Sequence, residues 1–197
     1  MRIAAVVLAA GESRRLGTPK QLLSYRGQPL LRAIAREACG SRCDDVAVVV
    51  RENDTAIAAC LEGLPVTVVA NPGWAEGIAS SIRRGVEWAT RQGAGAVLLL
   101  VCDQPALNAA HIDRLVSRYG AGARVVASRY ADSLGVPALF GRELFGALLS
   151  VRGSTGAKRV IRDEKYAVAV DWPEGVLDVD TPADAARMAE LTEAADA

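Results

Sequence analysis

Short apolar runs recur along the chain, separated by longer segments of mixed polarity. Most of these runs are apolar at every position, without alternation of polar and apolar residues, which is typical of strands buried on both faces of a sheet. We therefore predict buried strands at Ile3–Leu8, Val46–Val50, Val66–Val69, Val97–Val101, Val125–Ala127 and Ala167–Val170.

Segments with apolar residues at helical spacing lie between these runs. One helix is expected to begin after Pro29 and to end at Gly40, further apolar stripes cover residues 78–89 and 112–119, and a final helix is expected to begin at Thr181. Alternating strands and helices predict right-handed crossovers and a mainly parallel sheet covered on both faces. We expect one Rossmann-like α/β domain over residues 1–197, a three-layer sandwich that binds its ligand beyond the carboxyl ends of the strands.

The composition narrows the class of function. The chain has 197 residues, of which 51% are hydrophobic, and its 23 Lys and Arg balance its 23 Asp and Glu. This zero net charge argues against a dedicated nucleic-acid binder, whose surface is normally basic. A single histidine, His111, excludes His-rich zinc sites, so we expect any metal to have oxygen ligands.

The cysteines and the N-terminus favour a cytoplasmic protein. Cys39, Cys43, Cys60 and Cys102 form no CxxC pair, and we interpret them as reduced thiols. The positive start and apolar run of the first ten residues resemble a secretory signal, but the run is short and charged residues follow at once, so we expect no signal peptide. No apolar stretch reaches the roughly 18 residues of a membrane span, so we expect no membrane partner.

The loop after the first strand predicts an anion site. Gly11 and Gly17 let backbone N–H groups approach an anion, while Arg14, Arg15 and Lys20 supply positive charge. The first 20 residues carry four basic residues and one acid, a net charge of +3, which suits a polyphosphate. The spacing matches neither a Walker A loop nor a GxGxxG loop. The alternative is an ordinary turn with two solvated arginines.

Acidic residues at two other strand ends are candidate magnesium ligands. Asp103 follows the fourth predicted strand, and Asp178 and Asp180 alternate along an extended segment, hence on one face. Residues 171–197 hold eight acids against one arginine, a net charge of −7, which would face the basic loop across one cleft. The alternatives are a turn cap at Asp103 and a solvated edge strand at Asp178 and Asp180.

Two small-residue turns are further candidates, whereas hydrolase chemistry is disfavoured. Ser80 and Ser81 lie in the first turn of a predicted helix, which suits an anion or a base edge, and the turn at Gly153–Arg159 suits a phosphate or a plain helix cap. There is no GxSxG motif, His111 is expected to be a surface histidine, and Cys102 is expected to be a small core residue.

The N-terminal loop, Leu8 to Leu23, resembles the nucleotide-binding loop of the small-molecule nucleotidyltransferases. The whole chain is similar to the MobA-like NTP transferases, in particular to the MocA-like branch with the molybdenum cofactor cytidylyltransferases. Further matching motifs occur in the family's order at residues 71–83, 102–105, 135–140 and 178–182. The resemblance implies a fold of the nucleotide-diphospho-sugar transferase type and transfer of CMP from CTP to a phosphorylated acceptor such as molybdopterin, with Mg²⁺ and release of pyrophosphate.

The resemblance also implies roles for single residues. Arg15, Lys20 and Asp103 would be catalytic, Asp103 and Asp180 would hold the metal with Asp178 as the fallback, and Ala10 favours CTP because the guanylyl branch has glycine there. Nucleotide contacts would come from Leu8, Ala9, Ala10, Gly11, Ser13, Arg15, Gly17, Lys20, Ser80, Ser81 and Asp103. The acceptor would meet Gly135, Pro137, Gly153 and Gly156.

Two departures from the family pattern leave alternatives open. Ser154 and Thr155 stand where the family usually has an acid, and Leu16 stands where methionine is commoner. The acceptor or base could therefore differ, as in a guanylyltransferase or a sugar-phosphate cytidylyltransferase. Related folds have also been described as nicotinamide-dependent oxidoreductases, and a non-catalytic role beside a molybdoenzyme is conceivable. We expect a monomer or a small homo-oligomer, with a molybdoenzyme as partner and no nucleic acid.

Overall fold

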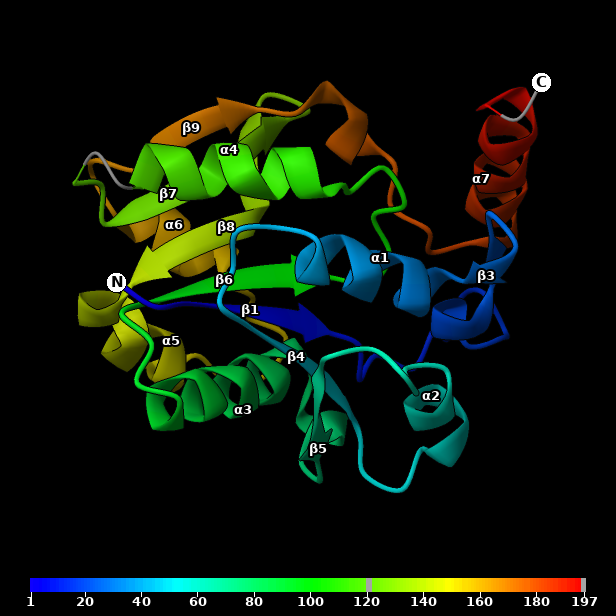
Figure 1. Cartoon of the computed structure of the whole chain (residues 1–197), viewed down its shortest axis with the longest axis horizontal. Helices are drawn as coiled ribbons and strands as arrows, with labels where there is room; N and C mark the ends of the chain where they lie inside the picture. Colours follow the sequence, from blue (N-terminus) through cyan, green and yellow to red (C-terminus); the bar gives the residue numbers. More distant parts are fainter. Residues whose placement is uncertain (120–121, 196–197) are drawn as a thin grey trace.

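A seven-stranded mixed sheet forms the centre of the computed structural model, which describes residues 1–119 and 122–195 (Figure 1). Its strand order is β5-β4-β1-β6-β8-β7-β9. Strand β8 runs antiparallel to both of its neighbours, whereas the β5-β4, β4-β1, β1-β6 and β7-β9 pairs are parallel. The strands are β1 (Ile3–Leu8), β4 (Asp45–Arg51), β5 (Thr67–Asn71), β6 (Ala96–Val101), β7 (Val125–Tyr130), β8 (Ser133–Gly141) and β9 (Val168–Asp171).

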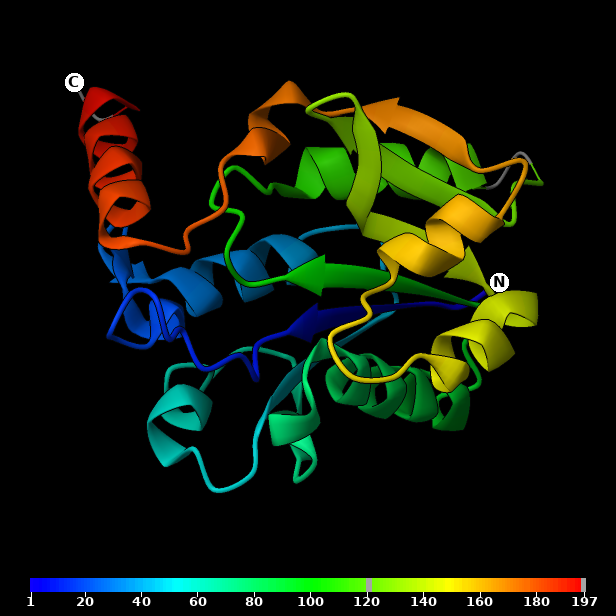
Figure 2. The same cartoon turned by 180° about the vertical axis from the view of Figure 1, so that it is seen from behind.

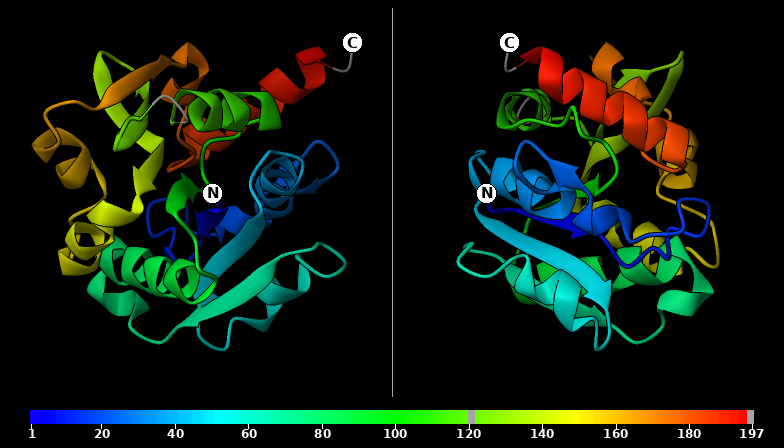
Figure 3. Two further views of the ribbon diagram at one scale, coloured as in Figure 1. Left: turned by 60° about the vertical axis from the view of Figure 1, so that its left-hand side comes forward. Right: turned by 90° about the vertical axis from the view of Figure 1, so that its right-hand side faces the viewer.

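Helices cover both faces of this sheet (Figures 1 and 2). One face packs against α1 (Leu30–Cys39), α2 (Thr55–Ala59) and α4 (Ala109–Tyr119), and the other against α3 (Ile78–Arg91), α5 (Phe145–Ser150) and α6 (Lys158–Asp163). The last helix, α7 (Pro182–Ala195), lies at the end of the molecule toward which β1 and β6 point; Figure 3 gives two side views. Short elements complete the fold: the β2-β3 hairpin (Ser24–Tyr25 and Gln28–Pro29) and the 3-10 helices η1 (Lys20–Leu22), η2 (Trp74–Glu76), η3 (Arg142–Leu144) and η4 (Pro173–Val176).

Strand β1 shows how the apolar runs build two cores. Its alternate side chains point to opposite faces, so Ala5 and Val7 join the cluster under α1 and α4, whereas Ala4 and Val6 join the cluster under α3. All four are fully buried. A strand in the middle of a doubly covered sheet must be apolar on both faces, which explains the unbroken apolar run.

The predicted three-layer, mainly parallel α/β fold is confirmed. Strands form at all six predicted runs, with ends that differ by up to three residues, and Thr181 caps α7 through hydrogen bonds with Asp184. Strand β8 was not predicted as a strand, because Gly135 and Pro137 interrupt its apolar pattern. No helix in the described residues is both long and apolar enough to span a membrane.

The expected surface position of His111 is wrong. His111 is fully buried, and its ring stacks on the indole of Trp172 at 4.6 Å between ring centroids. Arg114 Nη2 lies 2.9 Å from Nδ1 of His111, and a guanidinium can only donate, so Nδ1 accepts and Nε2 carries the proton. Nε2 then donates to Ser128 Oγ at 2.7 Å, and that hydroxyl donates to the carbonyl oxygen of Pro137. His111 is therefore a core residue that joins α4 to β7 and β8.

Candidate functional site

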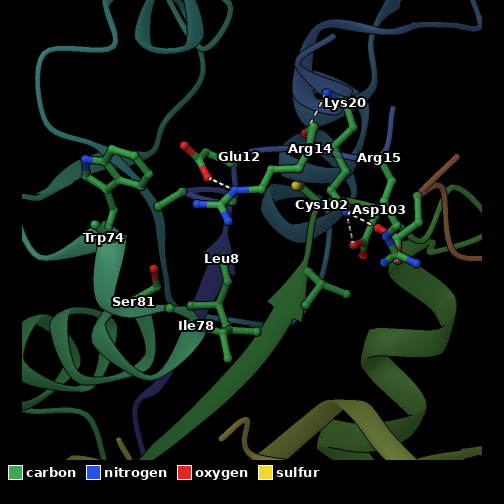
Figure 4. A pocket seen from close by; sticks show the side chains of 17 residues that line it. Leu8, Glu12, Arg14, Arg15, Lys20, Trp74, Ile78, Ser81, Cys102 and Asp103 are labelled. Atoms are coloured by element: carbon green, nitrogen blue, oxygen red, sulfur yellow. Dashed lines mark hydrogen bonds and ion pairs between the residues drawn. The ribbon is translucent and has the colours of Figure 1, made fainter. Parts of the chain in front are cut away.

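A cleft of about 450 Å³ opens at the carboxyl ends of β1 and β6 (Figure 4). Strand β1 pairs with β4 on one side and with β6 on the other, so this is the point where the winding of the sheet reverses, the usual ligand site of such folds. The volume suits a small molecule. The cleft is lined by Leu8, Ala10, Gly11, Glu12, Ser13, Arg14, Arg15, Lys20, Trp74, Ala75, Gly77, Ile78, Ser81, Val101, Cys102, Asp103 and Asp180.

The loop after β1 folds back on itself and returns Lys20 to the strand end. Ser13 and Gly17 adopt positive φ values of 55° and 76°, and the N–H of Gly17 donates to the carbonyl oxygen of Ser13. The Ser13 hydroxyl also accepts a hydrogen bond from the backbone N–H of Lys20 at 3.1 Å. Internal hydrogen bonds therefore hold this loop in place, although most of its residues between 11 and 19 are exposed to solvent.

Lys20 joins two carboxylates that lie far apart in the sequence. Its Nζ is 2.6 Å from Oδ2 of Asp103 and 2.8 Å from Oδ1 of Asp180 (Figure 4). Only 11% of the Lys20 side chain is exposed, whereas Arg15, which also pairs with Asp180, is 70% exposed. Burial alone would lower the pKa of Lys20, but the neighbouring carboxylates outweigh it and raise that pKa. Lys20 thus stays charged.

A backbone contact brings Asp180 to Asp103. The N–H of Val179 donates to the carbonyl oxygen of Asp103 at 2.9 Å, which holds the segment before α7 against the end of β6. The Lys20 hydrogen bond lowers the pKa of Asp180. Asp178 lies outside the cleft lining, and partial burial beside the Asp103 carboxylate raises its pKa to about 6. Lys20 therefore bridges Asp103 and Asp180, whereas Asp178 lies near Asp103 but outside the cleft lining.

The opposite wall comes from the connection between β5 and α3, which carries Trp74, and from the first turn of α3, which carries Ser81 (Figure 4). The buried Asn71 amide organises this connection, because its Nδ2 donates to the hydroxyls of Ser80 and Ser81 at 2.9 and 3.0 Å. The guanidinium of Arg51 lies 5.4 Å from the ring centroid of Trp74, a distance that permits a cation–π contact. An aromatic face therefore lies across the cleft from the charged cluster.

Most of the residues predicted from the sequence meet in this cleft. Leu8, Ala10, Gly11, Ser13, Arg15, Lys20, Ser81, Asp103 and Asp180 line it. Ala9, Gly17 and Ser80 do not: Ala9 is fully buried, with its N–H donating to Val49, and the Ser80 hydroxyl donates to Gly77. The predicted acceptor residues Gly135, Pro137, Gly153 and Gly156 also lie outside the lining.

The sequence reasoning gave no role to several other lining residues. Trp74 lies within the matching motif at residues 71–83, which is the signal that would have found it, whereas Ile78 and Val101 fit the pattern of core positions. Glu12 pairs with Arg14, so part of the positive charge of the loop is already neutralised. Gly153 lies just behind the wall, because its N–H donates to Glu76 Oε1 at 3.1 Å and its carbonyl oxygen accepts from Ala79.

The side chains in the cleft limit the reactions that it can support. Burial raises the pKa of the Cys102 thiol to about 12, so Cys102 is no nucleophile at neutral pH. The described residues contain no group of three or more His, Cys, Asp or Glu side chains placed to hold a metal ion. A Mg²⁺ site does not need three such side chains, since Mg²⁺ usually takes one or two carboxylates and completes its coordination shell with water and substrate phosphates. Asp103 and Asp180 fit that requirement.

Known proteins resemble this chain over nearly its whole length. Residues 5–169 match the model of the MobA-like NTP transferase domain. Nicotine blue oxidoreductase of Paenarthrobacter nicotinovorans is 31% identical over 84% of this chain and 84% of its own. Molybdenum cofactor guanylyltransferase of Rhodobacter capsulatus is 30% identical over 95% of each chain.

The solved structures agree with this resemblance. Rv0371c from Mycobacterium tuberculosis H37Rv has a TM-score of 0.80 and 33% identity, covering 96% of this chain and 99% of its own. A second structure of Rv0371c, a complex with manganese, has a TM-score of 0.76 over the same shares of the two chains. The family model covers well over half of the chain, and the fold and the cleft agree with it. The chain belongs to the MobA-like NTP transferase family.

Proposed function

We propose that this chain transfers CMP from CTP to the terminal phosphate of a small acceptor, molybdopterin carrying molybdenum, and releases pyrophosphate. The observation that carries the proposal is the Lys20 ammonium held between Asp103 and Asp180, beside a basic loop at the switch point of the sheet. Cations for a triphosphate and carboxylates for a divalent metal are the groups that phosphoryl transfer needs.

The nucleotide would occupy the cleft between the loop after β1 and the start of α3. Backbone groups of Ala10 and Gly11 would hold the base and ribose, and Lys20 and Arg15 would bind the triphosphate. Ala9, also expected to bind the nucleotide, would act only from behind, because its own N–H and C=O are bonded to Val49 and Gln21. Ser13 and Gly17 shape the loop that carries these groups. Ser81 and Trp74 would contact the nucleoside from the opposite wall, with Ser80 acting behind them through Asn71.

In-line attack would join an acceptor phosphate oxygen to the α-phosphorus while the bond from that phosphorus to the leaving pyrophosphate oxygen breaks. No protein nucleophile is needed, so the work of the chain is positioning and charge stabilisation. Bound Mg²⁺ would supply Lewis-acid stabilisation of the phosphate oxygens. Asp103 and Asp180 would hold that ion, and Lys20 and Arg15 would bind the pyrophosphate.

The proposal also specifies the base of the nucleotide and the acceptor of the transferred group. Ala10 supports CTP, because the guanylyl branch that this chain resembles has glycine at this position. The similarity to a molybdenum cofactor guanylyltransferase supports a molybdenum cofactor acceptor. Gly153 and Gly156, close behind the α3 wall, and Gly135 and Pro137 on β8 would contact that acceptor.

The proposal also includes a protein partner and a cellular compartment. A molybdoenzyme would receive the product. The four cysteines are free thiols, which agrees with the reducing conditions of the cytoplasm. We accordingly propose a cytoplasmic enzyme.

A second candidate function rests on the similarity to nicotine blue oxidoreductase. One thermal-shift panel separates the two, with CTP, GTP, ATP, UTP and NADPH each tested with and without Mg²⁺. We expect the largest stabilisation with CTP and Mg²⁺, since a ligand that binds the native state raises the unfolding temperature. Stabilisation by NADPH alone would overturn the transferase proposal, and stabilisation by GTP in place of CTP would correct the base.

A further inference from the structure

Gln21 is a buried polar residue directly beneath the loop that follows β1. It lies in η1, is fully buried, and does not line the cleft. Its amide Nε2 donates two hydrogen bonds, to the carbonyl oxygen of Ala9 at 2.7 Å and to that of Gly11 at 3.0 Å. One side chain thus holds two carbonyl groups of the loop.

These two bonds fix the direction of two N–H groups. In a planar trans peptide, the C=O and the N–H of the same unit point in opposite directions. The carbonyl of Ala9 shares its peptide unit with the N–H of Ala10, and the carbonyl of Gly11 shares its unit with the N–H of Glu12. Because Gln21 draws both carbonyls toward the interior, both N–H groups are turned the other way. Ala10 and Glu12 line the cleft, so that direction is toward the ligand.

The pattern of hydrogen bonds in the loop agrees with this orientation. The N–H of Ala9 donates to the carbonyl oxygen of Val49, which continues the ladder between β1 and β4. Within the described residues, the N–H groups of Ala10 and Glu12 donate to no protein acceptor. Donors with no protein partner beside a cleft are available to acceptor atoms of a ligand.

The other end of the Gln21 amide shows that this side chain does not simply fill space. Its Oε1 is buried without a hydrogen-bond partner in the described part of the chain. Leaving a polar atom in that state is unfavourable, and an apolar side chain of similar length would avoid it. What an apolar side chain lacks is the pair of N–H donors that hold Ala9 and Gly11.

We propose that Gln21 is a positioning residue for nucleotide recognition: it aims the backbone N–H groups of Ala10 and Glu12 into the cleft, where they bind the base and ribose. This inference rests on the proposed nucleotide-binding function and adds a residue to it. Lys20, the residue before it in the chain, would serve the triphosphate end. Gln21 and Lys20 therefore divide the ligand between them, and the two ends can be measured apart.

The test compares Gln21→Met with the matched control Gln28→Met, which makes the same change at a partly exposed glutamine outside the cleft. Binding of CTP, GTP and inorganic tripolyphosphate is measured by calorimetry in the presence of Mg²⁺. In Gln21→Met we expect the dissociation constant for the nucleotide to rise about tenfold, because binding must now also order the loop. The constant for tripolyphosphate should change less than about twofold, since the Lys20 ammonium is held by Asp103 and Asp180 and not by Gln21. Gln28→Met should match the wild type for all three ligands.

Other results would overturn the proposal. Equal weakening of nucleotide and tripolyphosphate would mean that Gln21 merely supports the fold, and unchanged nucleotide binding would mean that it positions nothing. A wild-type protein that binds tripolyphosphate but neither nucleotide would overturn the proposed function itself, before any variant is made. If Gln21→Met does not fold, Gln21→Asn answers the same question, because its shorter amide cannot reach both carbonyl groups and should show the same selective loss.

Discussion

The ammonium of Lys20 lies 2.6 Å from Oδ2 of Asp103, and the same ammonium reaches Asp180. One lysine thus pairs with both of the carboxylates proposed to hold the metal and offsets part of their negative charge. On the proposed function, the triphosphate of a bound nucleotide would offer this ammonium a new anionic partner, and the two carboxylates would become available to hold a divalent ion. Lys20 would therefore exchange partners on ligand binding.

Lys20→Met should strengthen the binding of Mn²⁺ to the nucleotide-free protein. Removing a positive charge at hydrogen-bond distance from both carboxylates removes a competitor for them, and we expect affinity to rise about tenfold or more. Titration followed by electron paramagnetic resonance measures free Mn²⁺ directly. Lys165→Met, which removes a charge outside the cleft, is the control. Weaker Mn²⁺ binding in Lys20→Met would contradict the exchange of partners.

The same substitution should have the opposite effect on the nucleotide. Lys20→Met removes a buried cation at the triphosphate end, so the dissociation constant of CTP should rise about 100-fold, as for the loss of a charge-assisted hydrogen bond. Isothermal titration with CTP measures the change. Equal affinity for CTP before and after the substitution would exclude a triphosphate role for Lys20.

Asp103→Asn should abolish Mg²⁺-dependent release of pyrophosphate while the fold stays intact. The amide oxygen still accepts a hydrogen bond from Lys20, but a neutral ligand holds a divalent cation poorly, and we expect turnover to fall about 1000-fold. A coupled pyrophosphate assay with CTP and the acceptor measures this loss. Asp163→Asn, an exposed change on α6, should keep wild-type turnover. Turnover that survives in Asp103→Asn would remove Asp103 from the metal site.

The fold was predictable where burial dictates sequence. Strand β1 is sandwiched between two helix layers, so every residue of Ile3–Leu8 had to be apolar and the run was evident. Strand β8 was not predicted, because Gly135 and Pro137 break the continuous apolar pattern that identifies buried strands. The position of His111 depended on a tertiary partner, Trp172, sixty-one residues away, which no local pattern reveals.

The site was predictable where its residues follow strand ends. Lys20 and Asp103 came from the charge and position of their segments, and the structure brings them together. The choice between Asp180 and Asp178 needed the backbone bond from Val179 to Asp103, which depends on how the segment before α7 packs. Gln21 gave no signal, because a glutamine after a basic loop is ordinarily a solvated residue, and only its burial and its two carbonyl partners show what it does.

The stability of the protein should fall between pH 6.5 and pH 4 in a way that depends on His111. Burial, helped by the charge of Arg114, lowers the pKa of His111 from 6.5 to about 4. Between these two pH values His111 is protonated in the unfolded chain but neutral in the folded protein. The free energy of unfolding therefore decreases as the pH falls through this window. The contribution is on the order of 3 kcal/mol, present above pH 6.5 and lost by about pH 4.

Urea unfolding at several pH values measures the effect of His111. Because carboxylates also titrate at low pH, the useful quantity is the difference between the wild type and His111→Gln, whose side chain carries no charge over the range. We expect the loss of stability between pH 6.5 and pH 4.5 to be clearly smaller in His111→Gln than in the wild type. Parallel curves for the two proteins would show that the pKa of His111 is the same in the folded and unfolded states, and would contradict the expected shift.

Gly77→Ala should lower both the free energy of unfolding and the affinity for nucleotide. Gly93→Ala is the control that separates backbone strain from the close approach to Gly153. Both glycines have positive φ, 115° and 71° respectively, so alanine strains the backbone at either position by about 1 kcal/mol or more. At Gly93 the new methyl group meets nothing within 4 Å, whereas at Gly77 it would lie 2.6 Å from the carbonyl oxygen of Gly153. Urea unfolding should therefore show a larger loss for Gly77→Ala. Its contact with Gly153 joins the cleft wall to the turn that begins at Gly153, so stabilisation by CTP should also fall in Gly77→Ala and persist in Gly93→Ala. Equal effects of the two substitutions would mean that the approach of Gly77 to Gly153 has no part in shaping the cleft.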